Sequence, residues 1–238
     1  MKPYHTIPIA DCGEPLVAIP PETFAMVDPH SYQQLGAPYG HQSPYRLRLG
    51  VLGALQLAQH SLQRYQPQWR IQIFDAYRPI AVQQFMVNHA FEELRQQRYP
   101  QQAHLTEDQH RDLMAEVIQF WAIPSHDPKT PPPHSTGAAI DISLIDHDGN
   151  PVPMGSPIDE ISERSWPDYF ADQTHPEAQC FHHHRQILNQ AMATAGFCRH
   201  PKEWWHFSLG DQLWAWLQQA SHPDQPAIAR YGCAEATR

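Results

Sequence analysis

Cysteine is scarce in this sequence, with four among 238 residues. The four, Cys12, Cys180, Cys198 and Cys233, are widely spaced and form no C-x-x-C pair. This spacing is typical neither of a cysteine-ligated zinc site nor of a disulfide framework. We therefore expect free thiols, which are characteristic of a reducing cytoplasm.

Long apolar runs are also missing. The first residues, MKPYHTIPIADCGEP, contain no continuous apolar segment of the kind that forms the core of a secretory signal. Nowhere does the chain approach a run of about 18 apolar residues, the length that crosses a bilayer. From these absences and the free thiols we predict a cytoplasmic protein without a membrane-spanning segment.

Positively charged residues are fewer than negatively charged ones. Lys and Arg number 16 against 25 Asp and Glu, which gives a formal net charge of −9. Nucleic acids and anionic membranes require a clustered positive field, and the sequence has no basic stripe that would provide one. We therefore expect neither nucleic acid nor a membrane as a partner.

The length and composition predict one globular domain over residues 1–238. Hydrophobic residues make up 41% of the chain, enough for an ordinary folded core. Residues 1–43 are rich in Pro, Gly and Tyr and show little periodicity, so we expect an irregular arm with a short strand at 15–19. We expect residues 226–238 to form a frayed tail.

Hydrophobic periodicity divides the rest of the chain into helices and strands. Apolar residues at helical spacing predict helices over 45–64, 80–98, 106–122, 178–197 and 211–220. Thr106 is a candidate N-cap, because acidic residues follow it in the first turn. Apolar runs of strand type are found at 69–77, 138–146 and 204–209. This order predicts an α+β fold whose strands gather in one sheet.

The segment HSTGAAID, residues 134–141, joins a histidine to an aspartate through a glycine turn. His134 comes just before a predicted strand, Asp141 lies within it, and His206 lies in a later strand that is a candidate sheet neighbour. Imidazole nitrogens and a carboxylate oxygen are ligands of catalytic zinc, which keeps a further position open. Spacing alone leaves both a zinc site and three unconnected structural residues open, because the sequence has no H-E-x-x-H.

Glu203 precedes His206 by three residues in the segment EWWHF. On a regular strand, two residues three positions apart point to opposite faces. Glu203 therefore reaches the same cleft as His206 only if the chain turns or bulges between them. If it does, Glu203 is a candidate general base beside a metal site.

Several other residues have ordinary structural interpretations. The three consecutive histidines at 182–184 point about 100° apart on a helix, so they do not converge on one ion, and we interpret them as a solvated helix face. Trp204 and Trp205 are typical of packing. Arg78 and Asp75, three residues apart near a strand end, are also compatible with a purely structural salt bridge.

In their order along the chain, the motifs resemble those of the zinc D-alanyl-D-alanine dipeptidases, a family that includes the vancomycin-resistance type. The matching segments are DAYRP at 75–79, PPHSTGAAID at 132–141, PMGSPIDE at 153–160, ERS at 163–165, AMATAGF at 191–197 and EWWH at 203–206. The resemblance runs from about residue 14 to about residue 217. It implies a central, mainly antiparallel sheet flanked by helices, a fold shared by the D-Ala-D-Ala metallopeptidases and the signalling domain of hedgehog proteins.

The resemblance implies catalytic roles at the matching positions. His134, Asp141 and His206 are expected to bind one zinc ion per chain. Glu203 is expected to be the catalytic base, and Arg78 to stabilise the transition state. The implied reaction is hydrolysis of the dipeptide D-Ala-D-Ala to two D-alanines by metal-activated water.

The resemblance also implies a substrate site. Asp159 and Tyr32 match positions that bind the amino end of the dipeptide, Phe85 is expected to line the small pocket, and Asp75 is expected to support Arg78. One departure is Pro132, where the family has a serine that can contact the substrate; the preferred dipeptide therefore stays open. The sequence does not identify the donors for the substrate carboxylate.

Two other functions remain open at the level of sequence. A D,D-carboxypeptidase or L,D-peptidase that trims longer peptidoglycan peptides is disfavoured by the missing secretory signal, because such enzymes are usually exported. A zinc-stabilised binding module without catalysis is disfavoured because Glu203 and Arg78 are both present. The sequence does not separate recycling of cell-wall D-alanine from depletion of the glycopeptide target, and it fixes neither the oligomeric state nor the physiological metal.

Overall fold

A five-stranded sheet forms the centre of the protein. The computed structural model describes residues 2–221, 224 and 226–236. In the sheet β2 and β4 run parallel, and the other three neighbouring pairs run antiparallel. The predicted α+β class with a mainly antiparallel sheet is therefore confirmed. The strand order is β2 (Ala25–Met26), β4 (Arg70–Asp75), β5 (Ala139–Ile145), β7 (His206–Ser208) and β6 (Cys198–Arg199).

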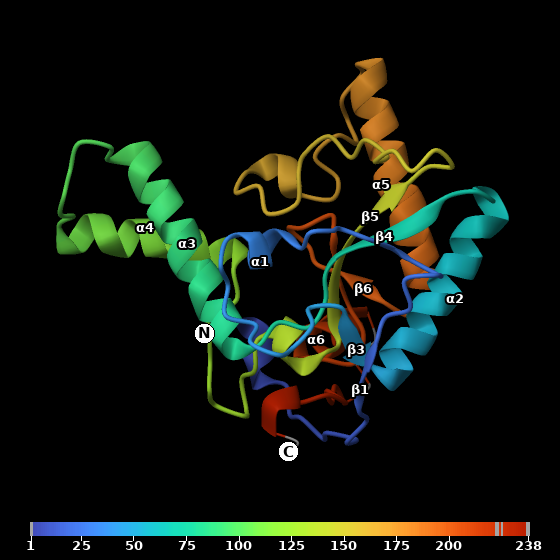
Figure 1. The fold of residues 1–238 in the computed structure, drawn as a ribbon, viewed down its shortest axis with the longest axis horizontal. Helices are drawn as coiled ribbons and strands as arrows, with labels where there is room; N and C mark the ends of the chain where they lie inside the picture. Colours follow the sequence, from blue (N-terminus) through green and yellow to red (C-terminus); the bar gives the residue numbers. More distant parts are fainter. Residues whose placement is uncertain (1, 222–223, 225, 237–238) are drawn as a thin grey trace.

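Helices α2 (Leu49–Tyr65) and α5 (Pro176–Thr194) pack together on one side of the sheet (Figure 1). Successive side chains of a strand point to opposite faces. Ile140 and Ile142 of β5 are fully buried in the apolar cluster that includes both helices. Asp141, which lies between them, therefore points to the opposite face, where the candidate site is found.

A second group of helices lies on the other side of the sheet (Figure 1). Its members α3 and α4 pack through an apolar cluster that includes Val82 and Val117. Thr106 caps α4 in a capping box with Gln109, which confirms the predicted N-cap. The group consists of α1 (Ser31–Gln34), α3 (Ile80–Arg98) and α4 (Glu107–Phe120).

Shorter elements complete the fold. The predicted strand at 15–19 is confirmed as β1, which pairs with β3 in a small second sheet. The predicted helix at 45–64 begins only at Leu49, because the three residues before it are extended in β3. The shorter elements are β1 (Leu16–Ala18), β3 (Arg46–Arg48), α6 (Gln212–Ser221) and the 3-10 helices η1 (Pro3–Thr6), η2 (Pro133–Thr136), η3 (Glu163–Ser165) and η4 (Ala234–Ala236).

The chain near its C-terminal end is packed against the N-terminal arm. Ala229 is fully buried and exchanges backbone hydrogen bonds with Pro8 and Ala10, at 2.9 and 2.8 Å. Glu235 accepts a hydrogen bond from the backbone N–H of Ile80 at the start of α3, at 2.9 Å. The prediction of a frayed tail is therefore wrong over residues 229–235, because the arm and α3 provide partners for this segment. The end of the predicted tail, residues 237–238, lies outside the described residues.

No helix in the described part of the chain is both long and apolar enough to span a membrane.

Candidate metal centre

The register of the central strands places three polar residues in a row. Asp141 of β5 lies directly opposite His206 of β7 on one side and opposite Asp75 of β4 on the other. A shift in register between Ile73 and Asp75 turns the Asp75 side chain toward the face of Asp141. The sheet therefore brings two carboxylates and one imidazole to the same face from three separate strands.

His134 reaches this row from the 3-10 helix η2. Gly137 ends the helix in the left-handed conformation, with φ 71°. A Cβ atom at this position would lie 2.2 Å from Cδ2 of Leu16, so that only glycine fits the turn. The turn connects η2 to β5 and allows His134 and Asp141, seven residues apart, to face one another.

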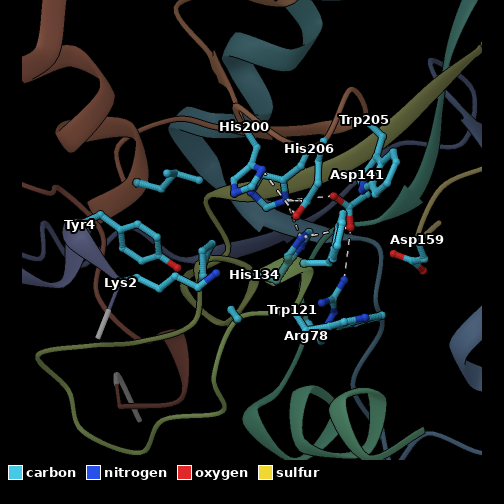
Figure 2. A pocket seen from close by; sticks show the side chains of 15 residues that line it. Lys2, Tyr4, Arg78, Trp121, His134, Asp141, Asp159, His200, Trp205 and His206 are labelled. Carbon is cyan, nitrogen blue, oxygen red and sulfur yellow. Dashed lines mark hydrogen bonds and ion pairs between the residues drawn. The ribbon is translucent and has the colours of Figure 1, made fainter. Parts of the chain in front are cut away.

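The three predicted metal ligands converge on one point (Figure 2). His134 Nε2 lies 3.2 Å from Asp141 Oδ2, and His206 Nδ1 lies 3.0 Å from Asp141 Oδ1. The two facing nitrogens of His134 and His206 are 3.2 Å apart. All three side chains are buried. The sequence prediction that these three residues come together is met in the structure.

The outer hydrogen bonds of both imidazoles direct lone pairs toward this point. His134 Nδ1 faces the carbonyl oxygen of Ala76 at 2.7 Å, which can only accept, so that Nδ1 carries the proton and Nε2 the lone pair. Ser208 donates to Asp211, at 2.8 Å, and therefore accepts from His206 Nε2 at 3.3 Å. His206 Nδ1 then also carries a lone pair.

Asp141 completes the set with a negative charge. The Arg78 guanidinium lies 3.3 Å from its Oδ2 and favours the charged carboxylate. Two neutral imidazoles and one carboxylate thus direct acceptor atoms at a shared position. The arrangement fits a divalent cation, and two nitrogens with one oxygen are a donor set of catalytic zinc sites.

Glu203 reaches the same cleft as His206, because it lies in a turn before the strand and not on the strand itself. Strand β7 begins only at His206. Glu203 Oε2 consequently lies 3.8 Å from His206 Nδ1, and its Oε1 lies 3.5 Å from Nδ1 of His200. Burial, reinforced by the nearby charges of Asp141 and Asp159, raises the pKa of Glu203 well above its ordinary value. A carboxylate with such a pKa is suited to accept and return a proton.

Arg78 approaches the cluster from the loop after β4. One of its terminal nitrogens lies 2.8 Å from Asp75 Oδ2 and 3.3 Å from Asp141 Oδ2. The predicted contact between Asp75 and Arg78 is therefore present. Asp75 also accepts hydrogen bonds from Tyr39 and His30, at 3.0 and 3.1 Å. Arg78 is thus held rigidly with its charge beside the metal ligands.

Asp159 lies at another side of the same cavity. Tyr32 donates to its Oδ2 at 2.7 Å, so that the two residues predicted to act together are in contact. Asp159 has φ 66°, an unusual backbone conformation for a residue other than glycine. Burial, together with the charge of Asp141, raises the pKa of Asp159 to about 7.

The loop that carries Asp159 is held in place by one buried cation. Arg185 of α5 donates to the carbonyl oxygens of Met154, Trp166 and Arg164, at 2.7, 2.7 and 2.9 Å. It also reaches the Ser156 hydroxyl at 3.2 Å. Burial, reinforced by two neighbouring arginines, lowers the pKa of Arg185 to about 10, so that it stays charged at neutral pH.

The cavity wall includes residues that spacing and motifs did not indicate. Lys2 and Tyr4 line it from the N-terminal arm, and Trp121, His200 and Trp205 line it from segments far apart in the sequence. No local pattern in the arm distinguishes Lys2 or Tyr4. A histidine three residues before Glu203 is the one signal from which His200 was predictable.

Phe85 does not lie where it was predicted, whereas Trp204 and Trp205 do. The structure does not bring Phe85 to the cavity wall; Phe85 stacks on His89 and packs against the apolar cluster of α3 and α4. Trp204 and Trp205 are both buried in the main core, as predicted. Trp204 also donates to the Ser156 hydroxyl at 2.9 Å, and Trp205 contributes to the cavity wall.

A buried cluster of two histidines and an aspartate, with a glutamate and an arginine at its edge, defines the class of metal-dependent hydrolases. A family model described as D-Ala-D-Ala dipeptidase matches residues 25–227. The chain belongs to this family of peptidases.

Relatives with a stated activity agree with the family. The chain is 51% identical over 241 residues to a D-alanyl-D-alanine dipeptidase of Synechocystis sp., with 99% of this chain and 98% of that protein covered. It is 40% identical over 90 residues to a D-alanyl-D-alanine dipeptidase of Escherichia coli, where the match covers 38% of this chain and 40% of that protein.

Two solved structures show a more distant likeness. One is VanYB in complex with D-Ala-D-Ala, at a TM-score of 0.45 and 16% identity, with 75% of this chain and 78% of that chain covered. The other is the vancomycin-resistance D,D-pentapeptidase VanY in complex with Zn(II), at a TM-score of 0.44 and 16% identity, with 81% and 83% covered.

Proposed function

We propose that this protein hydrolyses D-Ala-D-Ala to two D-alanines, with one zinc ion per chain bound by His134, Asp141 and His206. The proposal is carried by the convergence of three buried ligand atoms, all within 4.8 Å of one another, beside the carboxyl group of Glu203. The activity of the relative that matches over almost its whole length supports the choice of substrate.

The residues around the cluster have different roles in the reaction. Zinc, when bound, lowers the pKa of water and polarises a carbonyl group. Glu203 takes a proton from the attacking water and later delivers it to the leaving amine. The guanidinium of Arg78 stabilises the negative charge that develops on the carbonyl oxygen. Its ion pairs with Asp75 and Asp141 hold it in position before the substrate arrives, so little reorganisation is needed.

Asp159 makes the site one for a dipeptide. A free D-Ala-D-Ala carries an ammonium group next to its first Cα, and the Asp159 carboxylate, held by Tyr32, is a suitable partner for it. A longer peptidoglycan stem has an uncharged peptide bond at that position. It would therefore leave Asp159 buried without a cation, which disfavours its binding.

Two progress curves on the zinc-loaded protein test this function. One follows D-alanine release from D-Ala-D-Ala, and the other follows release from a pentapeptide that ends in D-Ala-D-Ala. We expect release from the dipeptide alone. Release from the pentapeptide would instead assign a D,D-carboxypeptidase. Release from neither substrate, with zinc bound, would contradict the proposal.

We also propose that the enzyme acts in the cytoplasm, on dipeptide related to cell-wall metabolism. The exposed residues Cys12 and Cys180 form no disulfide bond within the described part of the chain. Unpaired exposed thiols are typical of a reducing compartment. Immunodetection after fractionation of cytoplasm and periplasm tests the location, and recovery outside the cytoplasm would contradict it.

A further inference from the structure

The proposed function leaves the second end of the substrate without a partner. D-Ala-D-Ala ends in a carboxylate, which requires N–H or O–H donors. The segment before His134 offers none from its backbone, because residues 131–133 are three consecutive prolines without N–H groups. The donors must therefore come from another part of the cavity wall.

Lys2 is a cation of this wall that has no ion-pair partner among the described residues. Its side chain extends from the N-terminal arm toward the cluster (Figure 2). Its Nζ donates to the carbonyl oxygen of Gln119 at 3.4 Å, and no described carboxylate lies within 4.0 Å of it. Burial lowers the pKa of Lys2, while the charge of Glu203 acts in the opposite direction.

The other basic side chains of the described wall are already committed. Arg78 is paired with Asp75 and Asp141. His134 and His206 direct lone pairs at the metal position, as their outer hydrogen bonds require. His200 accepts a hydrogen bond at its Nδ1 from the backbone N–H of Lys202, at 3.2 Å, and Glu203 Oε1 lies 3.5 Å from the same nitrogen.

Tyr4 adds a hydroxyl donor beside Lys2. Burial, with the charges of Asp211 and Glu203, raises the pKa of Tyr4, so that its hydroxyl keeps its proton and can donate. The helix η1 that carries Tyr4 is fixed against α6, because Gln212 Nε2 donates to the carbonyl oxygen of Ile7 at 2.7 Å. The two donors thus belong to an anchored part of the fold.

The positions of these groups match the charge pattern of a dipeptide. Figure 2 shows Lys2 and Tyr4 on one side of the metal ligands and Asp159 on the other. A bound D-Ala-D-Ala has its scissile carbonyl between an ammonium and a carboxylate. With the carbonyl at the ligands and the ammonium at Asp159, the carboxylate points to Lys2 and Tyr4.

We propose that Lys2, assisted by the Tyr4 hydroxyl, binds the C-terminal carboxylate of the dipeptide and makes the enzyme selective for a free C-terminus. This inference rests on the proposed function. It assigns to the N-terminal arm a role in substrate recognition, at the end of the cavity opposite to Asp159.

Kinetics with two substrates test this role. D-Ala-D-Ala carries the carboxylate, and its C-terminal amide has the same size without the charge. We expect Lys2→Gln to raise KM for D-Ala-D-Ala about 10- to 100-fold, because a charge-assisted hydrogen bond is lost. The same variant should change KM for the amide by less than about threefold, because that bond is absent from the start. Lys2→Arg should restore much of the selectivity.

Lys129→Gln is the matched control, because Lys129 is exposed and absent from the cavity wall. It removes the same charge and should leave both substrates unaffected. Equal effects of Lys2→Gln on acid and amide, or no effect on either, would overturn the inference while the proposed function stands. A wild-type protein inactive on both substrates would contradict the proposed function and this inference with it.

Discussion

Glu203 differs from an exposed glutamate in its affinity for a proton. Burial raises the pKa of Glu203, and its Oε2 lies 3.8 Å from Nδ1 of His206. Glu203→Gln keeps the shape of the side chain but removes the oxygen that accepts the proton. We expect kcat to fall by about 10²- to 10⁴-fold, with the zinc content unchanged. Turnover and metal analysis on the same sample are the measurements, and an unchanged kcat would remove Glu203 from the role of base.

Ser208 orients His206, a proposed metal ligand, through a single hydroxyl. It accepts from Nε2 of His206 at 3.3 Å and donates to Asp211 at 2.8 Å. We expect Ser208→Ala to weaken zinc binding about 10- to 100-fold, because the imidazole loses the partner that sets its tautomer and orientation. Competition with a chelator measures this affinity.

Ser143→Ala is a suitable control for that measurement, since Ser143 also belongs to a central strand but bonds to Gln72 instead of a metal ligand. Equal zinc affinity in the Ser208→Ala variant and the wild type would show that the hydroxyl does not orient the ligand.

The proposed role of Asp159 predicts that substrate binding depends on pH near neutrality. Its pKa of about 7 means that it is a carboxylate above this pH and a neutral acid below it. The ammonium of the dipeptide is attracted only to the carboxylate. We therefore expect KM for D-Ala-D-Ala to rise as the pH falls through about 7. Steady-state kinetics of wild type and Asp159→Asn across this range measure it. A KM that rises equally in both proteins would exclude Asp159 as the titrating group.

At the scale of secondary structure, the long elements were predictable, whereas the two-residue strands were not. Helices such as α3 repeat their apolar spacing over several turns, which is enough to define both position and type. Strands β2 and β6 have two residues each, too few for any alternation to be visible. Leu47 continues the apolar spacing of α2 and therefore predicts a helix over residues 46–48, whereas pairing with β1 makes these residues a strand.

The loop from Met154 to Trp166 depends on α5 for its shape. Arg185 bonds to three of its carbonyl oxygens and to Ser156, and it is almost fully buried. We expect Arg185→Met to lower the free energy of unfolding by about 2–4 kcal/mol, because several buried acceptors lose their donor. KM for the dipeptide should rise as well, since the loop carries Asp159.

Urea denaturation and steady-state kinetics measure these two effects. The matched variant Arg64→Met removes an exposed arginine of α2 and should change the free energy of unfolding by less than about 0.5 kcal/mol. If Arg185→Met has an effect as small as this control, the loop does not depend on Arg185.

At the scale of the whole molecule, some residues of the candidate site are predictable from the sequence and others are not. Donor type and strand position made His134, Asp141 and His206 candidate ligands, and the resemblance of the surrounding motifs to a zinc peptidase family favoured a metal site over three unconnected residues. Lys2 and Tyr4 were not predictable, because what brings them to the cavity is the packing of η1 on α6, more than 200 residues later in the chain. Periodicity and spacing carry no information about a contact of that separation.

The N-terminal arm pairs with residues that are synthesised much later, around Ala229. The order of synthesis therefore affects when the arm takes its place in the cavity wall. The arm is held by backbone bonds from Ala229 and by Arg48, which also bonds to the carbonyl oxygen of Gly232. A ribosome makes these late residues after every ligand of the metal centre. A growing chain therefore possesses its proposed metal ligands before the residues that hold the arm of Lys2 and Tyr4 are made. The proposed recognition of the dipeptide carboxylate thus depends on a segment that is synthesised after the residues of the metal centre.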